Sequence, residues 1–144
     1  MPSDRSRLEN LARARQLHAE APDERETAKL LAAARRSLDD ARTGSLSAGS
    51  RFTLAYNAGH SLALAALRAA GFRPAGQGHR RILFQVLEAT AGASAQLSLA
   101  LAQHHDRRNR VEYEAAEPTE LETADLIRLV SELQELVLKG VKKR

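Results

Sequence analysis

One stretch of the chain, residues 52–70, carries apolar and small side chains at the spacing of an α-helix. These positions recur three or four residues apart: Phe52, Ala55, Tyr56, Gly59, Leu62, Ala63, Ala66, Leu67 and Ala70. The pattern predicts a long helix with one buried face. Gly71 follows directly, as is typical just beyond a helix C-terminus, and Pro74 prevents the helix from continuing.

Weaker helical spacing marks the other segments. We expect further helices over residues 4–18, from Pro22 to about Arg42, from His79 to about Gly92, from Ser94 through Val111, and from Thr119 to about Gly140. At the start of the last one, Thr119 and Glu122 have the spacing of a capping box. Residues 43–49 and 71–78 are predicted to be loops by composition, and no strand is expected.

The composition favours helices as well. Hydrophobic residues make up 43% of the 144 residues but aromatic residues only 3%, so we expect a core of Leu, Ala, Val and Ile. The length fits one domain. We therefore predict an all-α fold, an up-and-down bundle of four to five core helices. The bundle comprises residues 23–140, preceded by an N-terminal helical extension (1–22) and followed by a basic tail (141–144).

Several classes of site and location are excluded or disfavoured. The chain has no Cys, which excludes disulfides, thiolate metal sites and cysteine nucleophiles. No apolar run approaches the ~20 residues that span a bilayer, and the charged N-terminus lacks the apolar segment of a secretory signal. We expect a cytoplasmic protein without a membrane segment. No phosphate-binding glycine loop is present, and we expect neither a cofactor nor a metal, because adjacent His104 and His105 point in different directions on a helix.

Charge is distributed unevenly along the chain. Residues 42–111 contain nine arginines, no lysine and only two acids, a net charge of +7, whereas the whole chain carries +4. Arginine presents a planar fork of donors that suits phosphate and carboxylate groups. This bias predicts an anionic partner, although a GC-rich genome that favours Arg codons over Lys codons would give the same composition.

The densest polar group is the segment 104–113, HHDRRNRVEY. Arg108 falls on a predicted stripe with Leu97, Leu101, His104 and Val111, and a charge on an apolar face requires a partner. Two interpretations remain open: Arg108 pairs with Glu112 four residues later, or it contacts an anion such as RNA. The candidate ligand-binding residues are His104, His105, Arg107, Arg108, Arg110 and Glu112.

The order of features between residues 30 and 137 resembles the HEPN family (higher eukaryotes and prokaryotes nucleotide-binding domain). A helix with LLAAARRSLDDA leads through a loop to SRFTLAYNAGHSLALAALRAAGFRP. The family's second core helix is similar, with small residues and a Tyr before a GxRP-like turn. A Gly78–His79 entry into a short apolar helix, the segment RNRVEY and a capped last helix follow in the same order. The resemblance covers about three quarters of the chain.

The most specific part of the resemblance is the motif Arg-polar-x-x-x-His. In active HEPN ribonucleases, Arg and His from two protomers form a shared, metal-independent site where an RNA 2′-hydroxyl attacks the adjacent phosphate. Arg108 and Asn109 match this motif, and Tyr113 stands where the family has His. A phenol, with a reference pKa of about 10 against about 6.5 for imidazole, is a poor general base at neutral pH. We expect Arg108, Asn109 and Tyr113 to mark the motif without efficient catalysis.

The resemblance also implies partners. The family usually dimerises, so we expect a homodimer. The expected function is a non-catalytic module that binds RNA, a nucleotide or a nucleotidyltransferase-type protein through residues 107–113. The alternatives are a metal-independent ribonuclease of toxin type, as in toxin–antitoxin systems, and a purely structural helical interaction protein.

Overall fold

The computed structural model describes residues 4–76, 80–114 and 117–143, and of residues 80 and 110–114 it describes the backbone alone. Its helices and strands are α1 (Asp4–Arg13), β1 (Leu17–Ala19), α2 (Glu24–Ala41), α3 (Ala48–Ala69), β2 (Phe72–Pro74), α4 (Arg80–Gln85), α5 (Leu87–Ala91), α6 (Ala95–Glu114) and α7 (Glu120–Lys142). Within these residues, none of the helices combines the length and the apolar character that crossing a membrane requires.

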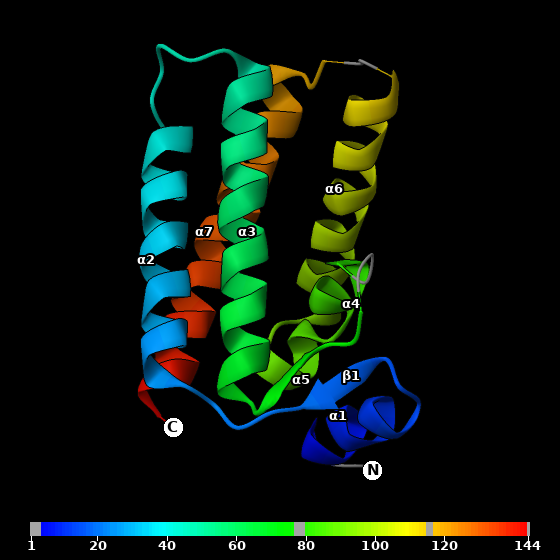
Figure 1. Cartoon of the computed structure of the whole chain (residues 1–144). Helices are drawn as coiled ribbons and strands as arrows, with labels where there is room; N and C mark the ends of the chain where they lie inside the picture. Colours follow the sequence, from blue (N-terminus) through cyan, green and yellow to red (C-terminus); the bar gives the residue numbers. More distant parts are fainter. Residues whose placement is uncertain (1–3, 77–79, 115–116, 144) are drawn as a thin grey trace.

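The all-α prediction is confirmed. The long helices α2, α3, α6 and α7 run alternately up and down, and α4 and α5 form a short descending step between α3 and α6 (Figure 1). Helix α1 and the two short strands lie at the end of the bundle where the chain both begins and ends (Figure 1).

Helix α3 is the central element of the core, because side chains all around it are buried, from Phe52 to Leu67. It packs mainly on α2 and α7. Gly59 permits the close approach to α7, since a Cβ there would lie 3.1 Å from Val130 Cγ2. The predicted aliphatic core is correct but incomplete, because Phe52, Phe72 and Phe84 are each only 1% exposed and are among its largest members.

The expectation of no strand is wrong. Strands β1 and β2 pair antiparallel, with His18 opposite Arg73, so part of the predicted 71–78 connector is a strand. Helix α1 ends at Arg13, earlier than predicted, and Arg15 adopts a left-handed backbone conformation that turns the chain. Leu17 and Phe72 are each 1% exposed. The two side chains are buried by packing against the rest of the fold. A strand of three residues is too short for its apolar spacing to predict that burial.

Two helix boundaries also differ from the sequence prediction. The expected helix before Gly92 is broken at Val86, so that α4 and α5 are separate helices. Gly92 has φ of +68° and caps α5 in the left-handed conformation. At the other end of the chain, α7 continues to Lys142, and the first residues of the predicted basic tail are therefore helical.

Arg68 near the end of α3 joins the N-terminal segment to the bundle. Its side chain is 3% exposed, yet it meets two carboxylates, with Nε 2.8 Å from Glu26 Oε1 and Nη2 3.2 Å from Glu20 Oε2. The remaining donors bond to the backbone carbonyls of Glu20, Ala21 and Phe72. A buried guanidinium is tolerated only where its donors are satisfied in this way.

Replacing Arg68 by Met is expected to lower the free energy of unfolding by about 3 kcal/mol, because three carbonyls and the Glu26 carboxylate lose their donor. Urea denaturation measures this change. As the matched control, Arg73→Ala removes a half-exposed guanidinium 3.5 Å from Glu20 and should change stability by less than about 0.5 kcal/mol. Equal urea midpoints for Arg68→Met and the unmodified protein would contradict the role of Arg68.

Candidate functional site

Helix α6 carries the polar segment predicted from the sequence, and the orientation of the helix separates its members. Leu97, Leu101 and His105 form a buried stripe, which the half-buried Arg108 and Asn109 continue. This stripe faces α3 and α4. The polar residues at its C-terminal end are therefore directed towards other helices.

Four side chains form a connected polar group, which we call the α3–α6 seam: Tyr56, His105, Arg108 and Asn109. Tyr56 Oη lies 2.8 Å from His105 Nδ1, and the two rings stack at 5.9 Å with 29° between their planes. Phe84 from α4 packs against both rings, at 6.1 Å from Tyr56 and 5.8 Å from His105. His105 is 7% exposed, so the seam is built into the helix packing.

Both ring nitrogens of His105 are occupied. Asn109 Nδ2 lies 3.4 Å from Nε2, on the side opposite the Tyr56 contact. A neutral imidazole donates from one ring nitrogen and accepts at the other, so the tautomer of His105 decides which group donates in each contact. The contact to Asn109 is long and weak, whereas the one to Tyr56 has good hydrogen-bond length. His105 is thus held in one orientation by residues from two helices.

Arg108 completes the seam from above the Tyr56 ring. Its Cζ lies 4.8 Å from the ring centroid, within the range of a cation–π interaction. Stacking uses the face of the guanidinium plane, whereas its N–H donors lie along the edge of that plane. The same guanidinium can therefore rest on Tyr56 and donate to a phosphate or a base.

Arg107, the neighbour of Arg108, is turned towards α7. Its Nε lies 2.6 Å from Glu122 Oε2, and Nη2 donates to the Glu117 carbonyl at 3.2 Å. The Arg107 side chain is 16% exposed. This arrangement gives Arg107 a structural role in fixing the end of α6 against the start of α7.

Carboxylates also bind the side chains of Arg81 and His104 near the seam. Arg81 of α4 donates to both carboxylate oxygens of Asp106, at 3.1 and 3.3 Å. His104 Nε2 lies 2.9 Å from Asp125 Oδ2, and its ring packs 5.9 Å from that of Phe52. The hydrogen bond from His104 is the main cause that lowers the pKa of the Asp125 carboxyl.

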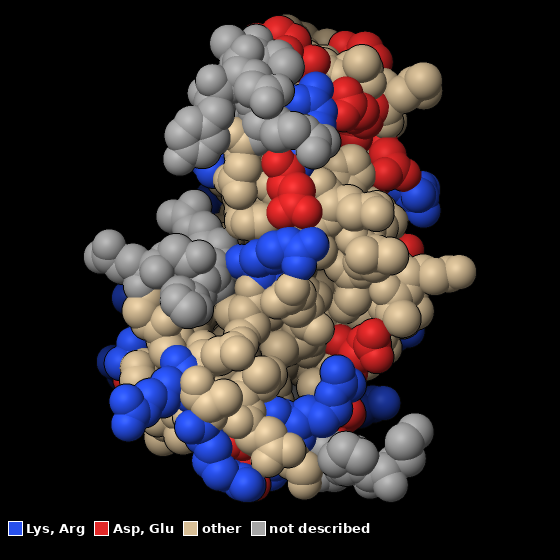
Figure 2. All heavy atoms as spheres, turned by 90° about the vertical axis from the view of Figure 1, so that its right-hand side faces the viewer, with Lys and Arg blue, Asp and Glu red and all other residues tan. Residues whose placement is uncertain are grey.

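Ion pairs across the fold explain part of the uneven charge along the sequence. Arg51 lies 3.3 Å from Glu120 and Arg68 lies 2.8 Å from Glu26, so arginines of the segment 42–111 pair with acids from the two flanking segments. Basic and acidic side chains are accordingly interspersed on the face that carries α6 (Figure 2). Part of the positive charge of residues 42–111 therefore serves ion pairs within the fold.

The predicted site residues have three different outcomes. Three meet in the seam: His105, Arg108 and Asn109. Two contact acids of α7: His104 and Arg107. The side chains of the remaining three, Arg110, Glu112 and Tyr113, lie outside the described residues. The whole of His79 also lies outside them. The pairing of Arg108 with Glu112 therefore stays a prediction.

Sequence reasoning placed Tyr56 on a buried helix face but missed its pairing with His105, 49 residues away. The available signal was a phenol on an otherwise apolar stripe, because a buried hydroxyl requires a hydrogen-bond partner. Among the described residues, no group of three His, Asp or Glu side chains is placed to hold a metal ion.

The chain matches no model of a known protein family, and neither a curated protein nor a solved structure is detectably similar to it.

Glu122 has two roles, and its titration provides a test of the α6–α7 junction. It closes the capping box with Thr119 at 3.0 Å and binds Arg107. The hydrogen bond from Arg107, followed by that from the Thr119 amide, lowers the pKa of Glu122 to about 2 from an ordinary value of 4.5. Because the folded pKa is the lower one, Glu122 stabilises the fold above about pH 4.5, and this contribution is lost as the pH falls towards about 2.

Glu122→Gln keeps the capping geometry and removes the charge. On acidification, the free energy of unfolding should fall by about 1 kcal/mol more in the unmodified protein than in this variant, because only the unmodified protein loses the Glu122 charge. The difference is small because Arg107 and Glu122 both remain partly solvated. Urea unfolding at a series of pH values measures the difference. Parallel stability curves for the two proteins would show that the Arg107–Glu122 pair contributes nothing.

Proposed function

We propose that the chain is a non-catalytic HEPN-like module that binds RNA, a nucleotide or a nucleotidyltransferase-type partner through the seam and the adjoining residues 107–113. The sequence resemblance supports the family, and a helical bundle is the fold that this resemblance implies. A cytoplasmic location belongs to the same proposal.

The observation that carries the proposal is the placement of Arg108. Its guanidinium rests on Tyr56 while the adjacent Arg107 is bound to Glu122. A guanidinium held over an aromatic ring has lost much of its rotational freedom, which lowers the entropic cost of forming hydrogen bonds to a phosphate. Arg guanidinium groups stack on and hydrogen-bond to unpaired RNA bases. The buried Tyr56 and His105 hold the half-buried Arg108 and Asn109 in place for such contacts. Single-stranded RNA is therefore the ligand class we favour.

Arg108→Ala is expected to weaken binding of short single-stranded RNA by roughly tenfold at low salt. Binding by the unmodified protein should fall steeply as salt rises, because bound phosphates release counterions. Fluorescence anisotropy measures both effects. Arg36→Ala, which removes an exposed arginine from α2, is the matched control and should leave the affinity nearly unchanged.

Absence of RNA or nucleotide binding at low salt would overturn this proposal in favour of a structural interaction protein. Equal losses in the Arg108 and Arg36 variants would indicate nonspecific attraction to a basic surface. Circular dichroism of each variant separates lost binding from lost folding.

The alternative of a toxin-type ribonuclease has one observation in its favour, the presence of an imidazole beside Arg108. However, His105 is buried with both nitrogens in contact, and Tyr113 is a poor base near neutral pH. We expect no efficient RNA cleavage in EDTA. General acid–base catalysis contributes about 10²–10⁴-fold, so Tyr113→His is expected to raise cleavage above that of the unmodified protein. Robust cleavage by the unmodified protein, abolished by Arg108→Ala, would establish the ribonuclease instead.

A symmetric homodimer that brings two copies of residues 104–113 together forms part of the proposal. Two-fold symmetry repeats the same surface on both subunits, and nearby Glu112 and Glu114 would offset the repulsion between the arginines. Light scattering at high micromolar protein is expected to give twice the chain mass of 15.7 kDa. A monomer mass under these conditions would contradict the dimer but not RNA binding.

A further inference from the structure

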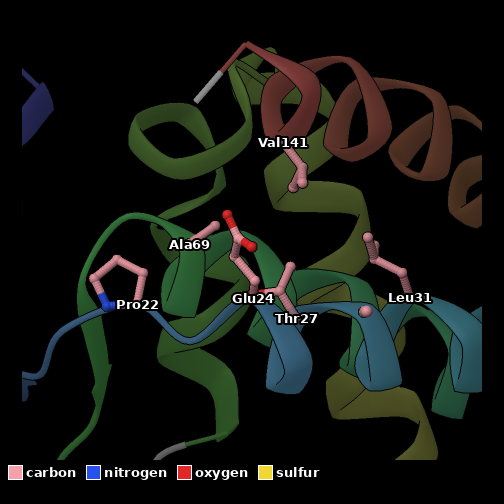
Figure 3. A pocket seen from close by; sticks show the side chains of 7 residues that line it. Pro22, Glu24, Thr27, Leu31, Ala69 and Val141 are labelled. Atoms are coloured by element: carbon pink, nitrogen blue, oxygen red, sulfur yellow. The ribbon is translucent and has the colours of Figure 1, made fainter.

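A pocket of about 430 Å³ lies at the end of the bundle where α2 begins and where α3 and α7 end (Figure 3). Its walls are mainly apolar and include Pro22, Leu31, Ala69 and Val141. Its volume is within the range of small-molecule sites, about 300–1,000 Å³. The seam residues lie in the N-terminal half of α3 and the C-terminal half of α6, away from the end where α3 stops, so this pocket belongs to a separate part of the surface.

Two polar side chains enter this apolar surface from the first turn of α2. Glu24 projects towards the space bounded by Ala69 and Val141, with Thr27 beside it (Figure 3). Thr27 is 6% exposed. Within the described part of the chain, neither side chain forms a hydrogen bond or an ion pair. Glu24 is exposed, and the Thr27 hydroxyl retains contact with solvent.

Capping of α2 does not account for these two groups. Asp23 is the N-cap residue, and its carboxylate accepts from the backbone N–H groups of Arg25 and Glu26. Glu26 in turn binds Arg68. An acid in the first helical turn, such as Glu24, interacts favourably with the helix dipole. The dipole accounts for an acidic residue at this position but not for the direction of its side chain. It does not explain a carboxylate and a hydroxyl directed over apolar walls.

The electrostatics of the pocket favour a cation. Ala69 is the last residue of α3 and Val141 lies in the last turn of α7, so two helix C-termini with partial negative charge converge on the pocket beside Glu24. Lys139 and Lys142 in the last turn of α7 and Arg68 in the last turn of α3 offset the negative charge of both helix ends, so the Glu24 carboxylate is the group that favours a cation. An anion would meet the Glu24 carboxylate, and is disfavoured.

We propose that this pocket binds a small organic cation, an ammonium group carried on an alkyl or aryl body. The apolar walls enclose the hydrocarbon part, and the ammonium N–H groups donate to the Glu24 carboxylate and the Thr27 hydroxyl. The proposal is independent of RNA binding, because it uses no residue of the seam.

The test is an NMR titration of the full chain with three probes of matching shape: phenethylammonium, the neutral 2-phenylethanol and the anionic phenylacetate. The ammonium probe is expected to shift the signals of Thr27, Ala69 and Val141 and to bind about tenfold more tightly than the alcohol, which corresponds to one charge-assisted hydrogen bond. Phenylacetate should produce no shift at these residues.

Variants assign the effect to the pocket. Glu24→Gln should weaken phenethylammonium binding about tenfold and bring it close to that of 2-phenylethanol. Glu132→Gln, an exposed position in the middle of α7, removes the same charge elsewhere and should have no effect. Ala28→Leu, at an exposed helical position that lines the pocket, fills the pocket and should abolish binding of both probes. Circular dichroism verifies that each variant is folded.

Three outcomes would overturn the proposal: equal binding of all three probes, undiminished binding to Glu24→Gln, or no shift at the pocket residues up to about 10 mM probe. A fourth concerns another occupant. If dilution of the protein alone moves the signals of the pocket residues, a second copy of the chain fills the pocket and the organic cation is the wrong ligand.

Discussion

The buried guanidinium of Arg68 is the interaction on which the arrangement of the chain depends. It ties the start of α2, the end of α3 and strand β2 together through carboxylates and carbonyl groups. Without it, the segment preceding α2 would be held mainly by apolar contacts such as those of Leu8 and Leu17. Because α3 is the central helix, anchoring its C-terminal end also sets the orientation of the whole helix. The position of Tyr56, in the N-terminal half of α3, depends on this orientation.

The seam and the surrounding ion pairs divide the arginines into two groups. Arg107 and Arg81 are held by Glu122 and Asp106, and their charges serve to position α6. Arg108 lies over the Tyr56 ring, with its Cζ 4.8 Å from the ring centroid. The cation–π contact places Arg108 in the same group as Tyr56, His105 and Asn109, and our proposal of ligand binding at Arg108 rests on this placement.

Local patterns in the sequence were sufficient for the helices but not for the site. The apolar spacing of residues 52–70 and the Thr119–Glu122 capping box predicted α3 and the start of α7 correctly, since both depend on neighbours within a few residues. The β1–β2 pair and the contact of Tyr56 with His105 join residues that are far apart in the chain. His105 has the wrong spacing for the family motif, yet the helix brings it within reach of Asn109, one turn later.

Side-chain NMR of isotope-labelled protein titrated with short single-stranded RNA tests the central claim most directly. The account predicts that the guanidinium signal of Arg108 and the side-chain signals of His105 and Asn109 shift together as RNA is added, while those of Arg107 and Arg81 stay in place. Shifts at Arg107 and Arg81 without a shift at Arg108 would contradict the assignment of the seam as the RNA-binding site.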